Sequence, residues 1–122
     1  MWADDAAADY ARRIQRYLPF EERVGEPKVE RRDRLVALDP GGRDLSSEGW
    51  AELVERAAMD GVRELVFALG GADGHGAGVC EAAHSVVRLG PITMNHAVAR
   101  VVVVEQLYRA CAIRAGSPYH HG

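Results

Sequence analysis

The stretch from Ile92 to Gly122, ITMNHAVARVVVVEQLYRACAIRAGSPYHHG, constrains the fold of this chain more than any other. It predicts a final helix that begins near Asn95 or His96. The run Val101 to Val104 is β-branched and prefers a strand, but the flanking residues and the length of the segment favour a helix. A helix that is apolar on most sides is unusual at the end of a small domain. The tyrosine ring and the imidazole that follow it, in Tyr119 and His120, indicate a C-terminus with a functional role.

Upstream of this helix, apolar strand patterns alternate with helical patterns. The expected elements are an amphipathic helix from Trp2 to Leu18 ended by Pro19, a charged connector over Val24 to Arg34, a strand from Arg34 to Asp39 closed by the turn Pro40-Gly41-Gly42, a helix capped by Ser46 or Ser47 and followed by Gly61, a strand from Glu64 to Leu69, a short helix near Val79 to His84, and a strand from Ser85 to Thr93 interrupted by Gly90-Pro91. This alternation predicts an α/β fold with a mostly parallel sheet flanked by helices. The length of 122 residues predicts one domain, residues 1–122.

Composition narrows the class of protein. An apolar content of 48 % supports a real core, and a formal charge of −3 gives no electrostatic signature of nucleic-acid binding. Cys80 and Cys111 fit small buried thiols in a reducing compartment. The start, Met1 to Asp9, is acidic and lacks the pattern of a secretory signal, and Val101 to Val104 is far too short to span a membrane. We therefore expect a soluble, cytoplasmic protein.

A glycine-dominated turn, Gly70 to Gly78, follows a strand and opens a helix, where nucleotide-binding loops often lie. It has no G-x-G-x-x-G register, and Ala77 stands where a P-loop has lysine. Two readings stay open at this point. The turn is either a generic tight turn or a backbone surface that a ligand can approach closely.

Other candidate groups carry weaker signals. His75, Cys80 and His84 lack the paired spacing of metal motifs, so we expect no metal site. No serine stands in a recognisable nucleophile setting. Arg100 interrupts the apolar helix and needs either a carboxylate partner or an anionic ligand.

Seven short motifs occur in a fixed order. They are Leu35-Val-Ala-Leu-Asp39, Leu45-Ser-Ser-Glu48, Leu69-Gly-Gly-Ala-x-Gly74, Thr93-Met-Asn-His96, Val98-Ala-Arg-Val101, Glu105-Gln-Leu-Tyr-Arg-Ala110 and Gly116-Ser-Pro-Tyr-His120. In this order and spacing, the chain resembles the ribosomal RNA large-subunit methyltransferase H family of the SPOUT class. The resemblance covers residues 33–120 well and residues 2–20 more loosely.

The resemblance implies a fold, a reaction and a set of residues. The fold has a C-terminal trefoil knot, among the rare exceptions to unknotted topology. The reaction is S-adenosylmethionine-dependent methylation of N3 of a pseudouridine in 23S ribosomal RNA, by a homodimer that builds its site across two subunits. The implied cofactor contacts are Leu38, Gly70, Gly71, Leu89, Gly90, Pro91, Ile92, Thr93 and Met94.

Four further residues occupy the matching catalytic positions: His96, Arg100, Tyr119 and His120. The sulfonium methyl is already electrophilic, so the protein has to align it with N3 and help to remove the imide proton. By resemblance, His120 or His96 aids deprotonation or base placement, and Arg100 holds charge on the base or a phosphate.

The chain departs from the family pattern in its first half. The family opens with an apolar strand and carries a lysine-rich loop and a further helix, whereas this chain goes from Phe20 to Leu35 through a short charged stretch. Asn95 also replaces a proline. These departures leave a second hypothesis open, a shortened knotted homodimer that binds the cofactor or is catalytically inert. A third hypothesis, an unrelated nucleotide-binding module, requires the ordered motifs to be coincidental.

Overall fold

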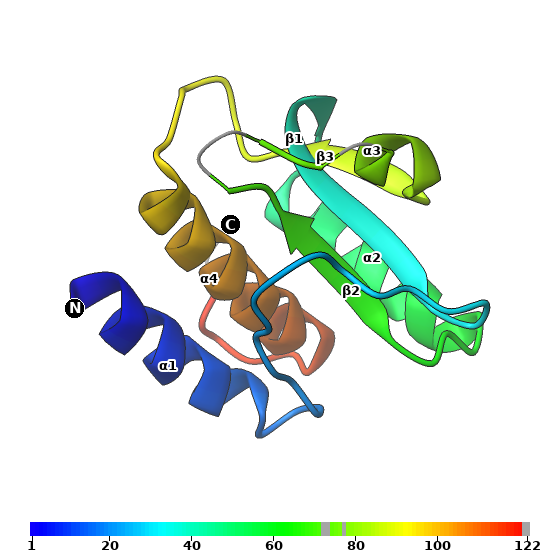
Figure 1. Cartoon of the computed structure of the whole chain (residues 1–122). Helices are drawn as coiled ribbons and strands as arrows, with labels where there is room; N and C mark the ends of the chain where they lie inside the picture. The colour runs from blue at the N-terminus through cyan, green and yellow to red at the C-terminus, as the bar shows by residue number, and fades with distance from the viewer. Residues whose placement is uncertain (72–73, 77, 121–122) are drawn as a thin grey trace.

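The computed structural model describes residues 1–71, 74–76 and 78–120, and Figure 1 shows how its helices and strands are arranged. They are α1 (Trp2–Ile14), β1 (Arg34–Asp44), α2 (Ser47–Met59), β2 (Leu65–Leu69), α3 (Val79–Ala82), β3 (Ser85–Arg88) and α4 (His96–Arg114). The predicted alternation of helices and strands is confirmed. Two predicted helix starts are also confirmed, since the side chains of Ser46 and Asn95 cap α2 and α4.

The three strands form one parallel sheet in the order β2-β1-β3. In the register of this sheet, Leu38 of β1 lies opposite Leu69 of β2 on one side and Val87 of β3 on the other. The parallel α/β sheet flanked by helices is therefore as predicted. Because the strands are parallel, their carboxyl ends lie at one edge of the sheet.

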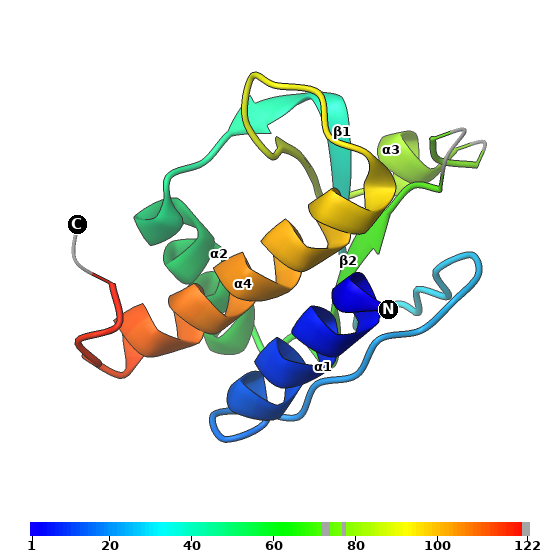
Figure 2. The same cartoon turned by 90° about the vertical axis from the view of Figure 1, so that its left-hand side faces the viewer.

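The last helix lies between two others. Figures 1 and 2 both show α4 running alongside α1 and α2, with α4 in the middle. Its buried residues are Ala99, Val103, Val104, Leu107, Ala110, Cys111 and Ala112. The helix predicted for the valine run is therefore confirmed, and its apolar faces are covered by the two neighbouring helices and the sheet. The trefoil knot stays a prediction.

One hydrophobic cluster joins the helices to the sheet. Its most deeply buried side chains are Ile14, Val36, Val87 and Val104, from α1, β1, β3 and α4. Trp50 of α2 stacks on Phe67 of β2 with ring centroids 5.5 Å apart. The sheet, α1, α2 and α4 are thus held by the same core.

The predicted turn Pro40-Gly41-Gly42 is wrong. β1 continues through it to Asp44, and its pairing with β3 resumes at Arg43 after an irregularity that follows Leu38. A Cβ on Gly42 would lie 2.7 Å from the backbone of Val86 and Val87, so only glycine lets the two strands approach here. The extra residues therefore form a bulge within the strand.

Three other elements are shorter than predicted. β3 ends at Arg88 instead of Thr93, α3 ends at Ala82 instead of His84, and α1 ends at Ile14 before one further turn. Gly90 has a φ of +119°, which takes the chain out of the strand conformation. Among the described helices, none is long and apolar enough to cross a membrane.

Candidate functional site

The carboxyl edge of the sheet gathers three predicted cofactor segments. Gly70 directly follows Leu69, which pairs with Leu38, and Leu89 comes two residues after Val87, the other partner of Leu38. Neighbouring strands are about 5 Å apart, so the three segments span about 10 Å. This is where parallel α/β sheets commonly bind ligands.

The glycine turn is compact on one side and open on the other. A Cβ on Gly70 would lie 2.7 Å from the backbone of Gly74, and the Gly74 N–H donates to the carbonyl of Gly71 at 2.9 Å. No atom of the described chain lies within 4 Å of a Cβ built on Gly71 or Gly90. Of the predicted turn, Ala72, Asp73 and Ala77 lie outside the described residues. Among the described residues, the backbone at Gly71 and Gly90 is thus open to close approach, which suits a ligand bound through main-chain contacts.

A cavity of about 340 Å³ adjoins the loop between β3 and α4. Leu89, Gly90 and Pro91 line it together with the end of β1, the start of α2 and Gln106 of α4. It contains three of the nine predicted cofactor residues. Leu38, Gly70 and Gly71 lie outside its lining, and Ile92 is 71 % exposed in the same loop. The carbonyl of Leu38 accepts a hydrogen bond from His75 Nε2 at 2.7 Å.

His96 and Arg100 lie at the first turns of α4 and differ in their surroundings. His96 is exposed and has no hydrogen-bond partner among the described residues. Arg100 donates to both carboxylate oxygens of Glu22, at 2.9 and 3.0 Å, and to Asp4 at 2.6 Å. These two carboxylates raise the pKa of Arg100. Of the two alternatives for Arg100, the carboxylate partner is the one present in the chain.

Tyr119 and His120 fold back against the second half of α4. The Tyr119 hydroxyl donates to Glu105 at 2.8 Å, and Arg109 donates to the same carboxylate at 2.7 Å. Burial and nearby groups that include Glu105 raise the pKa of Tyr119. Arg109 also donates to His120 Nδ1 at 3.0 Å, because a guanidinium can only donate. The Nε2–H of His120 therefore donates to Glu48, at 2.8 Å.

The four predicted catalytic residues thus form two groups within one chain. Arg100 and Arg109 are nine residues apart, which is about 14 Å along a helix axis. His96 and Arg100 lie on one side of this interval, and Tyr119 and His120 lie on the other. The sequence argument missed the carboxylates that engage these groups, Asp4, Glu22, Glu48 and Glu105. Only the Glu105–Arg109 pair carried a sequence signal, its i, i+4 spacing.

The predicted absence of a metal site rested on the sequence spacing of His75, Cys80 and His84. In the structure, His75 and Cys80 lie close to each other, and the third member of their cluster is Asp39 instead of His84. The carboxylate was missed because Asp39 is far from the other two in sequence. Only the parallel pairing of β1 with its neighbours brings it to the same edge.

Comparison with known proteins identifies the family to which this chain is similar. A family model described as "Predicted SPOUT methyltransferase" matches residues 21–120. The Ribosomal RNA large subunit methyltransferase H of Xanthomonas campestris pv. campestris (strain B100) is 35 % identical over 141 aligned residues, covering 98 % of this chain and 90 % of the relative. That alignment is longer than the chain, so part of the relative has no counterpart in it.

A second relative carries the same name. The Ribosomal RNA large subunit methyltransferase H of Brucella abortus (strain S19) is 46 % identical over 86 residues, which cover 70 % of this chain and 51 % of the relative. The chain spans about half the length of the Brucella relatives that it matches. The family match over residues 21–120 includes β1, β2, β3 and α4, and therefore the whole edge described above. The chain belongs to the SPOUT methyltransferase family.

Proposed function

We propose that this chain is an S-adenosylmethionine-dependent methyltransferase that methylates N3 of a pseudouridine in large-subunit ribosomal RNA. The observation that carries the proposal is the family match over residues 21–120, together with a relative named as a large-subunit rRNA methyltransferase that aligns with 98 % of the chain. The proposal places the protein in the cytoplasm, where ribosomes are its substrate. It treats residues 1–122 as one domain, consistent with the hydrophobic cluster that joins the described helices to the sheet.

The carboxyl edge of the sheet fits the proposed cofactor. Leu38 and Leu89 offer apolar surface, and Gly70, Gly71 and Gly90 offer backbone without side chains. The continuation of the loop, Pro91 to Met94, leads from this edge into α4. When bound, the cofactor supplies an electrophilic methyl group. The residues of the chain then have to orient this methyl group and to help to remove the proton of the base.

Proton removal from the base is assigned to the histidines. His96 is exposed at the start of α4, and its ring is free of partners among the described residues. In His120 both ring nitrogens are engaged, by Arg109 and Glu48. We therefore propose that His96 accepts the proton of the imide nitrogen. His120 and Tyr119 are proposed to position the base. Arg100 is proposed to contact the developing negative charge, which requires it to leave its pairs with Asp4 and Glu22.

The separation of the two catalytic groups supports a homodimer. Residues about 14 Å apart along one helix can still share a site if one group comes from each subunit. Exposed apolar side chains lie near the first group: Trp2 of α1 is 56 % exposed, Ile92 is 71 % exposed and Val98 of α4 is 36 % exposed. The ion pair between Arg100 and Asp4 holds the starts of α1 and α4 together. We propose this face as the subunit interface, with the C-terminal knot of the family.

A mixing experiment tests the shared site. Arg100→Ala and His120→Ala variants are each expected to have little methyl transfer to ribosomes. After subunit exchange, half of the dimers contain one chain of each kind, and each such dimer has one intact site. About a quarter of wild-type activity should then return. No recovery from variants that are folded, dimeric and shown to exchange subunits would contradict a site built across two chains.

The second candidate function is a cofactor-binding protein without transfer activity. The pairing of Arg100, Tyr119 and His120 with carboxylates inside the chain favours it, because these groups are then unavailable to a substrate. Calorimetric titration with S-adenosylmethionine, followed by transfer of a labelled methyl group to ribosomes, separates the two. Binding with transfer supports the enzyme, binding without transfer supports the second candidate, and absence of binding contradicts both.

A further inference from the structure

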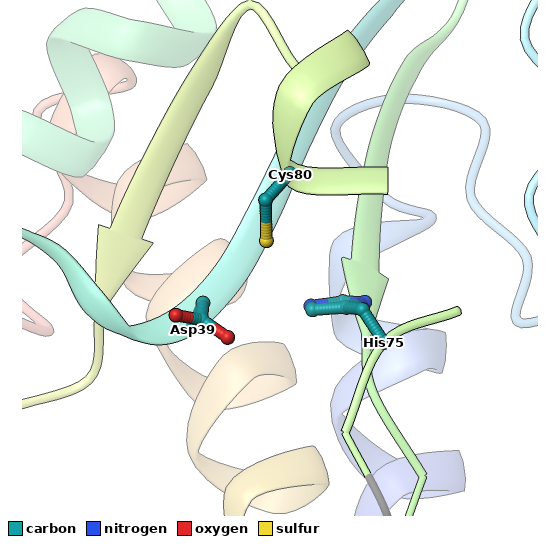
Figure 3. Close-up of side chains that lie close together, drawn as sticks. All are labelled: Asp39, His75 and Cys80. Atoms are coloured by element: carbon teal, nitrogen blue, oxygen red, sulfur yellow. The ribbon is translucent and has the colours of Figure 1, made fainter. Parts of the chain in front are cut away.

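Asp39, His75 and Cys80 form a cluster that the proposed methyl transfer does not use. They come from β1, the glycine turn and α3, and one potential ligand atom of each lies within 4.8 Å of the other two. All three residues are partly buried. In Figure 3 the sulfur of Cys80 points toward the gap between the Asp39 carboxylate and the His75 ring.

Backbone hydrogen bonds orient two of these side chains. The Gly41 N–H donates to Asp39 Oδ2 at 2.9 Å. The Nε2–H of His75 donates to the carbonyl of Leu38 at 2.7 Å, so the neutral ring keeps its lone pair on Nδ1. A histidine that binds a metal through one nitrogen commonly donates from the other to a carbonyl, which fixes its tautomer and ring orientation. Asp39 and His75 are therefore each held by a backbone hydrogen bond, and binding through His75 would use the lone pair on its Nδ1.

The local charge suits a cation. The carboxylate of Asp39 lies in the cluster itself, and Glu81 follows Cys80 directly in α3. A bound cation would offset this negative surrounding and stabilise the thiolate. A thiolate, an imidazole and a carboxylate together favour zinc over magnesium and calcium, which bind oxygen atoms almost exclusively.

We propose that Asp39, His75 and Cys80 bind a divalent zinc-type cation through one carboxylate oxygen, one ring nitrogen and the Cys80 sulfur. Three protein ligands leave a fourth position for water. Bond lengths of about 2.0–2.3 Å place the ligand atoms of a tetrahedral ion about 3.3–3.8 Å apart, which is within the 4.8 Å limit that the three ligand atoms satisfy. The thiol proton is released to solvent as the metal–sulfur bond forms. The sequence alone led us to expect no metal site, so this proposal departs from that expectation.

The test uses zinc itself in competition with a chromophoric chelator, and cobalt as a spectroscopic substitute. We expect one equivalent of zinc per chain, and with cobalt a near-ultraviolet charge-transfer band from the thiolate. Cys80→Ser and His75→Ala should each weaken zinc binding by more than the ~10–100-fold that loss of an orienting partner costs. Two matched controls, Cys111→Ala and His84→Ala, remove a thiol and an imidazole outside the cluster and should bind zinc as the wild type does.

Three results would overturn the site. They are less than one equivalent of zinc on the folded wild-type chain, unchanged zinc affinity in both Cys80→Ser and His75→Ala, or a cobalt complex without the thiolate band. Circular dichroism of each variant confirms that it is folded, so a loss of binding is not a loss of structure. The outcome does not depend on methyl transfer, since the measured quantity is zinc affinity.

Discussion

At the scale of single residues, Tyr119 shows how the tail is held to α4. Its ring packs edge-on against Tyr108 with centroids 4.6 Å apart, the Arg109 guanidinium lies 4.9 Å from its centroid, and its hydroxyl donates to Glu105. Glu105 and Arg109 lie on the same face of α4 because they are four residues apart. The chain turns back toward this face after Gly116, which has a φ of +72°. The tail is therefore anchored to α4 at the ring of Tyr119.

The first prediction concerns this hydroxyl. Tyr119→Phe removes a hydrogen bond to a carboxylate, so the free energy of unfolding in urea should fall by about 1 kcal/mol. The control is Tyr17→Phe, because Tyr17 is 43 % exposed and its hydroxyl has no partner among the described residues. Equal effects of the two substitutions would contradict the assigned hydrogen bond.

The same hydroxyl predicts an alkaline dependence. The pKa of Tyr119 in the folded chain is raised above the ordinary value of about 10. The unfolded chain therefore loses the phenol proton first as pH rises, and the stability that the protonated phenol adds is lost above about pH 10. The unfolding free energy of the wild type should fall more steeply from pH 10 upward than that of Tyr119→Phe. Parallel curves would contradict the raised pKa.

At the scale of elements, the start of α4 depends on a side-chain cap. Asn95 Oδ1 accepts a hydrogen bond from the Val98 N–H at 3.0 Å. Asn95→Ala should lower the unfolding free energy by about 1 kcal/mol, whereas Asn95→Asp, which keeps the acceptor, should not. Thermal and urea unfolding provide the measurement. A stable Asn95→Ala variant would show that packing alone sets the start of the helix.

The bulge in β1 gives a second prediction at this scale. A Cβ at Gly42 meets the backbone of β3 at 2.7 Å and cannot be accommodated by a side-chain rotation. Gly42→Ala should therefore cost about 1–3 kcal/mol of unfolding free energy. In the control, Gly41→Ala, the nearest atom is Asp39 Oδ2 at 3.1 Å, which can move. Equal costs in the two variants would contradict the close approach of β1 and β3.

The elements also show what sequence reasoning could reach. Local signals predicted the strands around Leu35 and Leu69, the caps Ser46 and Asn95, and the helical reading of the valine run, because each depends on propensity and spacing within one segment. The continuation of β1 past Pro40 could not be predicted, because it depends on pairing with β3, far away in the chain. Contacts between distant segments also limited the prediction of the site. The motifs pointed to Arg100 and His120, but the carboxylates that pair with them lie up to 96 residues away in the sequence.

At the scale of the whole molecule, the account depends on the association of two chains. Val98→Glu places a charge on the proposed interface, at a position that is already 36 % exposed in the single chain. Sedimentation should show twice the chain mass for the wild type and a single chain for Val98→Glu, with methyl transfer lost in the variant. A wild-type monomer that transfers methyl groups would contradict the shared site, whatever the family relationship.

The measurement that tests the central claim most directly is methyl transfer to large-subunit ribosomal RNA. Ribosomes lacking the methyl group are incubated with the protein and labelled S-adenosylmethionine, and the nucleosides of the digested RNA are identified by mass spectrometry. The account predicts one new labelled methyl group, on N3 of a pseudouridine of the large-subunit RNA, and none in the small-subunit RNA. A folded protein that binds S-adenosylmethionine but labels no large-subunit nucleotide would contradict it.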